Sequence, residues 1–141
     1  YGRAVEREGH TPDCWLGLAL CHAATNEAEE AEFAFRKSIQ MDDRFSDATV
    51  ALAVFLVDQG REEEAFTLMA DTLERYEDTS LAYGSVAINL MANRRKAAMH
   101  DLNNALSEYY DGHQILLDFF PDLRKDREIN AIFELYKPRD L

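Results

Sequence analysis

One pattern of apolar residues recurs along the chain at a spacing of about 34 residues, and it limits the folds open to this sequence. Its clearest copy lies between Ser46 and Tyr76. There, an almost continuously apolar segment from Ala48 to Val57 is followed by a turn around Gly60 and a segment with apolar residues three and four apart. The second segment predicts an amphipathic helix, and the first predicts a helix that is covered on two sides. Two such helices cannot bury this much apolar surface alone, so the pair needs similar neighbours.

Two further copies of the pattern supply these neighbours. The first segments of the three copies align at Trp15, Leu18, Ala19 and His22, at Thr49, Leu52, Ala53 and Leu56, and at Tyr83, Val86, Ala87 and Leu90. The second segments align at Ala31 and Phe35, Ala65 and Met69, and Ala98 and Leu102. Together they form the W-x2-L-G-x2-Y then A-x3-F arrangement of a 34-residue helical repeat. The third copy aligns when one residue is dropped near Arg94.

The chain thereby resembles the tetratricopeptide repeat (TPR) family, through three degenerate repeats. The match is good at Trp15 and Phe35, but Ala19 replaces the usual glycine, and no copy has the proline that often ends the repeat. The resemblance implies an all-α fold: a right-handed superhelical stack of antiparallel helix pairs, or α-α solenoid, with a C-terminal capping helix. The expected units are repeats at residues 12–43, 46–77 and 80–110, the second helix of a truncated preceding repeat at 1–10, and C-terminal capping helices at 113–137.

Residues that favour helix ends mark several of the expected boundaries. Thr11 is suited to cap a helix whose first position is Pro12. Ser46 or Asp47 is available to cap the first helix of the second repeat, and Asp126 to cap the last helix of the chain. These positions agree with the helix pairs that the apolar pattern predicts.

Composition argues against several classes of partner and location. The 141 residues carry a net charge of -12, which disfavours duplex nucleic acid or an anionic membrane as a partner. The longest apolar run holds about ten residues, half of the roughly 20 that a membrane-spanning helix needs. Cys14 and Cys21 stand on one expected helix, roughly 10 Å apart at about 1.5 Å per residue, which is beyond disulfide reach. We therefore expect a reduced, cytoplasmic setting.

The resemblance also implies a binding surface. In the family, the first helices of the repeats line a concave groove that commonly binds an extended peptide or a helix. Carried onto this sequence, the groove residues are Leu16, Leu20, Val50, Val54, Gly84 and Ile88, with Val57 and Met91 close by. These residues are apolar or small, so the implied partner is another protein that offers an apolar peptide or an amphipathic helix. The alternatives are that the chain's own C-terminal helix fills the groove, or that a second copy fills it in a homodimer.

No residue pattern predicts catalysis, a metal or another cofactor. The close ligand pairs of metal sites are absent among His10, Cys14, Cys21 and His22. His100 and His113 have no acidic or nucleophilic companion at motif spacing. We therefore expect a non-catalytic protein-protein interaction module or scaffold rather than an enzyme. Two alternatives stay open: a small TPR chaperone for secreted clients, and a structural or oligomerising spacer in a larger protein.

Overall fold

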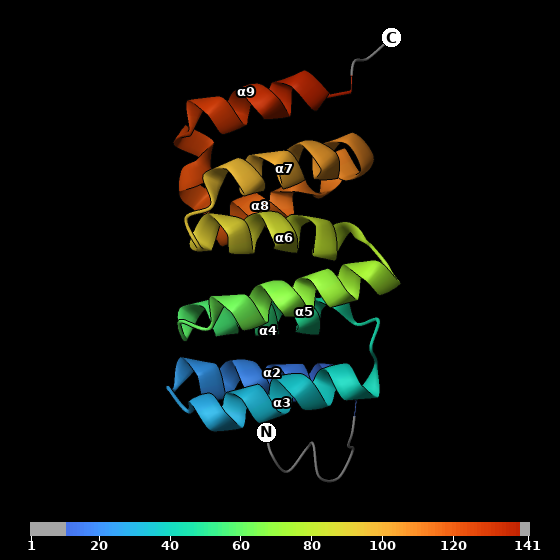
Figure 1. The fold of residues 1–141 in the computed structure, drawn as a ribbon, viewed down its shortest axis with the longest axis vertical. Coiled ribbons are helices and arrows are strands. Elements are labelled where there is room, and N and C mark those ends of the chain that lie inside the picture. The colour runs from blue at the N-terminus through green and yellow to red at the C-terminus, as the bar shows by residue number, and fades with distance from the viewer. Residues whose placement is uncertain (1–10, 139–141) are drawn as a thin grey trace. The chain divides into compact units, whose positions relative to one another are not determined.

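The computed structural model describes residues 11–138, so the helix expected at residues 1–10 lies outside the described part. Helices account for the regular structure of residues 11–138, which contain no strand, and the all-α class is confirmed (Figure 1). No helix in this part is both long and apolar enough to cross a membrane. The chain divides into two compact units, Tyr1–Tyr76 and Glu77–Leu141. The division falls between the second and third expected repeats.

In its described residues, the first unit consists of two helix pairs. Their helices are α2 Pro12–Ala24, α3 Ala28–Met41, α4 Ser46–Asp58 and α5 Glu62–Arg75. The chain reverses direction within each pair, so that α2 packs on α3 and α4 packs on α5 (Figure 1). In addition, α3 packs against α4, and α2 contacts α4. The first helix α2 therefore touches α4, the first helix of the next pair, as well as its own partner α3.

The helix starts of the first unit follow the sequence in one place and depart from it in another. Thr11 caps α2 as expected, because its side-chain oxygen accepts a hydrogen bond from the backbone N–H of Cys14 at 3.2 Å. The expectation that Ser46 or Asp47 caps α4 was wrong. The N-cap is Phe45, which makes no side-chain capping bond, and Ser46 is already the first helical residue and is buried.

The turn inside each helix pair has the same local geometry. One residue of each turn has a positive φ: Asn26 (62°), Gly60 (79°) and Asn93 (62°). The next residue donates its backbone N–H to the carbonyl five positions earlier, at 2.8 Å in all three turns. This is the Schellman motif, which ends a helix by satisfying its last carbonyls. It recurs after 34 and then 33 residues. The expectation that a residue is dropped near Arg94 was wrong, because the helix Thr79–Met91 already begins 33 residues after Ser46–Asp58, so the residue is missing from the connector that follows Arg75.

Gly60→Ala is expected to lower the free energy of unfolding by about 1 kcal/mol, because a Cβ disfavours positive φ. Nothing lies within 4 Å of the place where the Cβ would stand, so the effect is confined to the backbone. Gly60→Asn is the matched control and should keep more of the stability, since Asn26 and Asn93 adopt the same conformation. Urea unfolding followed by far-UV circular dichroism measures both, and equal losses would contradict the prediction.

The core of the first unit lies where its two helix pairs meet. The ring centroids of Phe35 on α3 and Phe55 on α4 are 5.5 Å apart, and both side chains are buried. Within the first pair, the fully buried Ala19 and Ala31 are small enough for α2 and α3 to pack closely. The hydroxyl of Ser38 donates to the carbonyl of Pro12 at 2.8 Å, which ties α3 to the start of α2.

The second unit contains the third helix pair and the C-terminal segment. Its helices are α6 Thr79–Met91, α7 Arg95–Tyr109, α8 His113–Phe119 and α9 Arg127–Tyr136, with 3-10 turns at Tyr110–Gly112 and Pro121–Lys125. In this unit α6 packs on α7, α8 packs on α6, and α9 packs on α7 (Figure 1). Asp126 caps α9 as expected, accepting from the N–H of Ile129 at 3.1 Å. Within this unit, the last helix thus lies against α7 rather than against the first helix of the pair.

Tyrosine hydroxyl groups fix the helices of the second unit to one another. Tyr83 of α6 is fully buried, and its hydroxyl donates to the carbonyl of Tyr109 at 2.7 Å. This burial raises the pKa of Tyr83 to about 12. The hydroxyl of Tyr136 on α9 donates to the side-chain oxygen of Asn103 on α7 at 3.0 Å. The aromatic residues of this core therefore set helix positions as well as filling space.

Candidate functional site

The predicted groove residues of the first unit lie on its two first helices. We call the set the first-helix face: Leu16 and Leu20 on α2, and Val50, Val54 and Val57 on α4. Leu20 is 51% exposed, and Leu16, Val54 and Val57 are half-buried. Val50 is only 6% exposed and adds almost no surface. The two neighbouring helices therefore both present apolar side chains that the described residues leave partly uncovered.

The predicted groove residues of the second unit are less accessible. Gly84 and Ile88 on α6 are buried, and Ile88 is only 1% exposed. Met91, at the end of α6, is half-buried. Of these three residues, Met91 offers the largest exposed fraction to a partner. The role of all eight residues as one groove stays a prediction.

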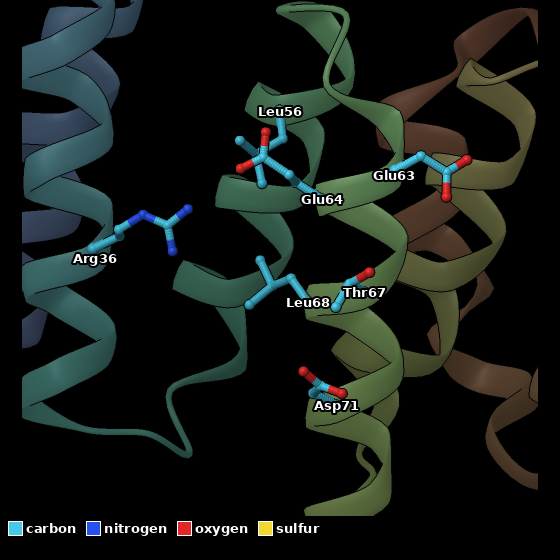
Figure 2. Close-up of a pocket in the computed structure, with 7 residues that line it drawn as sticks. All are labelled: Arg36, Leu56, Glu63, Glu64, Thr67, Leu68 and Asp71. Carbon is cyan, nitrogen blue, oxygen red and sulfur yellow. The ribbon is translucent and has the colours of Figure 1, made fainter.

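A cleft of about 380 Å³ lies beside the second helices of the first unit (Figure 2). It is lined by Arg36, Leu56, Glu63, Glu64, Thr67, Leu68 and Asp71. Figure 2 shows Arg36 extending from α3 toward Leu56 of α4 and Glu64 of α5. We call it the α4–α5 cleft. Arg36 of α3 lies on one side of it, and acidic and apolar side chains of α4 and α5 line the other side.

A charge network holds α3 at the edge of the α4–α5 cleft. The guanidinium of Arg61, in the turn before α5, donates to Glu32 of α3 at 3.1 Å and to Glu64 of α5 at 2.8 Å. Arg36 donates to Glu32 at 3.0 Å. The hydrogen bonds from Arg61 are the main cause that lowers the pKa of both Glu32 and Glu64 below the ordinary carboxyl range, and the charge of Arg36 contributes to each. Complementary charge therefore accompanies the apolar contact between α3 and the second pair.

A second cleft, of about 320 Å³, lies on α2 and α3, and we call it the α2–α3 cleft. It is lined by Trp15, Leu18, His22, Glu29, Glu30, Phe33 and Ala34. Phe33 is 62% exposed, and its ring meets Trp15 edge to face at 6.0 Å between centroids. At the rim, Glu29 and Glu30 are exposed and form no ion pair with any residue in the described range 11–138. An exposed aromatic thus stands beside two carboxylates that residues 11–138 leave without an ion pair.

The two clefts occupy the same place in consecutive helix pairs. Their lining residues correspond at a distance of 34 positions: His22 with Leu56, Glu29 with Glu63, Glu30 with Glu64, Phe33 with Thr67, and Ala34 with Leu68. The α4–α5 cleft is flanked by α3, whereas residues 11–138 place no corresponding helix on the α2–α3 cleft. The apolar pattern of the sequence did not predict this site. Phe33 was the available signal, because it is an aromatic residue outside the A-x3-F positions of an amphipathic helix.

Several polar clusters of residues 11–138 join one structural element to another. No group of three or more His, Cys, Asp or Glu side chains in this range is placed to hold a metal ion. Buried Asn89 donates to Asp101 at 2.8 Å, and the Ser85 hydroxyl donates to the same carboxylate at 2.7 Å, so this cluster joins α6 to α7. Nδ1 of His22 lies 3.3 Å from Oε1 of Glu27. The pKa of Glu27 is lowered mainly by its hydrogen bond with the Thr25 hydroxyl and, to a smaller extent, by His22.

These surfaces are the basis for assigning a function, because comparison with known proteins adds none. No family model, no curated protein and no solved structure matches the chain.

Proposed function

We propose that this chain is a non-catalytic protein-protein interaction module of the TPR type. Its helix pairs would continue into a right-handed superhelical stack, and the first-helix face would bind an apolar peptide or an amphipathic helix of another protein. The observation that carries the proposal is the partly uncovered apolar surface that α2 and α4 present side by side. The identical turns, recurring after 34 and 33 residues, support a repeat architecture.

The mechanism we propose is preorganisation. The Phe35–Phe55 contact and the Arg61–Glu32 hydrogen bonds hold the two helix pairs of the first unit together before a partner arrives. Most of the conformational entropy lost on binding is then lost by the partner, which favours affinity. An apolar face of this kind suits the nonpolar side of a helix, with anchors three and four residues apart. Contact with this face does not require charge on the partner.

We also propose a cytoplasmic location and a protein partner rather than a nucleic acid or a membrane. Two free cysteines, Cys14 and Cys21, lie on the same helix about two turns apart and cannot pair with each other. The net charge of -12 repels polyanions. Fractionation of the source cell with an antibody to this chain tests the location.

Val54→Asp is expected to weaken partner binding about tenfold or more while the helical content stays nearly unchanged. Val54 is half-buried on α4, so its replacement puts an unpaired charge into an apolar contact, at a cost of about 1–3 kcal/mol. Affinity capture from a lysate of the source cell, with wild type and variant side by side, identifies the partner and measures its loss. Leu135→Asp is the matched control, because Leu135 is 75% exposed on α9, and it should capture the partner normally.

One result would contradict the use of this face. A folded Val54→Asp variant that captures the same partner as the wild type would place binding elsewhere. An unfolded variant would show that Val54 belongs to the core, and Leu20→Asp, at a residue that is 51% exposed, then tests the same face without that difficulty. If neither protein captures a partner and sedimentation shows a dimer, a second copy occupies the face.

A further inference from the structure

We propose that the first-helix face selects a basic amphipathic helix, in which a lysine or an arginine stands at each end of the apolar stripe. The inference rests on the proposed function, because it gives the chemistry of the partner for that same face. Two observations carry it: the side chains of α4 that its neighbours in the first unit leave uncovered, and the charges at the two ends of the strip that they form.

The uncovered part of α4 is one narrow strip. This helix packs against α2, α3 and α5, and eight of its thirteen residues are buried. The other five are Asp47, Ala51, Val54, Val57 and Asp58. Positions 47, 51, 54 and 58 are spaced i, i+4, i+7 and i+11, so they follow one line along the helix, which we call the α4 strip. The strip has an apolar centre and an exposed carboxylate at each end.

The helix α2 carries the same line 34 positions earlier, where it consists of Asp13, Gly17, Leu20 and Ala24. Figure 1 shows α2 and α4 running in the same direction, and the two helices contact each other. Asp13 and Asp47 therefore lie at the same end of the first-helix face. Neither helix contains a lysine or an arginine, so the charges at both ends of the face are negative.

The carboxylate of Asp58 is placed against the helix dipole. Asp58 is the last residue of α4, where the partial negative charge of the helix end repels a carboxylate, and no basic residue stands in the last turn. Arg61, the nearest cation along the chain, donates instead to Glu32 and Glu64. Asp58 forms no ion pair with any residue in the described range 11–138. A cation brought by a partner would offset the repulsion that α4 retains at this end.

A helix that lies along α4 fits both ends of the strip at once. Asp47 and Asp58 are eleven positions apart, which is about 16 Å at about 1.5 Å per residue. The two cations of the partner helix therefore stand about eleven positions apart as well, with apolar anchors three and four apart between them. Apolar contact itself needs no charge on the partner. The cations at the ends decide between partner segments that are equally apolar.

The same charges disfavour a second copy of the chain as the occupant. In a symmetric dimer both copies use the same surface, so α4 of one copy would lie against α4 of the other. Because each α4 strip has an aspartate at both ends, an aspartate faces an aspartate whether the two helices are parallel or antiparallel. Such a pairing is repulsive. A basic segment of another protein suits the face better.

Three synthetic peptides of one design test the charge preference. Each is a capped, fluorescein-labelled helix of about 16 residues with leucines at i, i+3, i+4 and i+7, and its two end positions, about eleven apart, hold Lys, Gln or Glu. Fluorescence anisotropy in the presence of the full chain at low salt measures binding. The Lys peptide should bind at least about fivefold more tightly than the Gln peptide, and the Glu peptide more weakly than both. These differences should shrink as salt is added, because the aspartates are exposed.

Asp58→Asn separates a binding role from a structural one. It should reduce the preference for the Lys peptide over the Gln peptide by about twofold or more. It should also raise the urea midpoint of unfolding, because it removes a carboxylate from the negative end of α4. Glu74→Gln, at an exposed position of α5, changes the net charge equally and should leave the peptide preference as in the wild type.

The possible failures of this proposal and of the proposed function can be told apart. If all three peptides bind equally and Val54→Asp weakens each of them, the charge preference is overturned while the first-helix face keeps its function. If no peptide binds, or if Val54→Asp in a folded chain weakens none of them, both proposals are overturned. A lower urea midpoint for Asp58→Asn would overturn the charge preference, because Asp58 would then be needed by the fold. A dimer in sedimentation that the Lys peptide does not dissociate would place a second copy on the face.

Discussion

Phe35→Ala is expected to lower the free energy of unfolding of the first unit by about 3–5 kcal/mol. The side chain is 1% exposed, and its ring lies 5.5 Å from that of Phe55, where α3 packs on α4. Alanine would remove this contact and leave a cavity between two helix pairs that the Arg61–Glu32 hydrogen bonds still hold in place. Urea unfolding, followed by far-UV circular dichroism and by the fluorescence of Trp15 in the same unit, measures the loss.

Phe33→Ala is the control for this experiment, because it removes the same ring from the same helix. Phe33 is 62% exposed, so its replacement should change the stability by about 0.5 kcal/mol or less. Similar losses for the two variants would show that the Phe33 side chain is also part of a packed core. That result would count against the α2–α3 cleft as an open surface.

Much of the fold follows from the sequence because helix periodicity and capping are local properties. The helix from Pro12, the cap at Thr11 and the cap at Asp126 depend on residues within one turn of each other, and the structure has them where the sequence predicts them. The N-cap of α4 was predicted wrongly, because the side chains of Ser46 and Asp47 are both of a type that can cap a helix. There the start of the helix lies one residue earlier, and Ser46 is buried within it.

The surfaces were harder to predict because exposure depends on packing between distant segments. Val50 and Val54 are the same residue type, four positions apart on α4, yet Val50 is buried and Val54 is half-buried. The α2–α3 cleft escaped notice for a related reason. Its equivalence to the α4–α5 cleft is a matter of position, whereas the side chains differ in type, with Phe33 opposite Thr67 and His22 opposite Leu56. A repeat pattern read from side-chain type alone does not reveal such a site.

Gly112→Ala is expected to lower the free energy of unfolding of the second unit by about 1–3 kcal/mol through overpacking. A Cβ on Gly112 would collide with Cγ2 of Thr79 and would stand 2.9 Å from Cε2 of Tyr83. Tyr83 cannot easily yield, because its ring is fully buried and its hydroxyl is bonded to the carbonyl of Tyr109. Urea unfolding followed by far-UV circular dichroism measures the effect.

The cause of this loss can be separated from backbone strain by a second substitution. Gly112 has a φ of -81°, which any residue adopts, so alanine costs nothing in the backbone there, unlike at Gly60 with its φ of 79°. Thr79→Ser removes the colliding methyl group, and the double variant Thr79→Ser with Gly112→Ala should therefore recover part of the stability. The contact with Tyr83 persists, so recovery should be incomplete. If the loss of stability in the double variant equals the sum of the losses in the two single variants, the collision with Thr79 is relieved by other movements. Gly112 is then required for another reason.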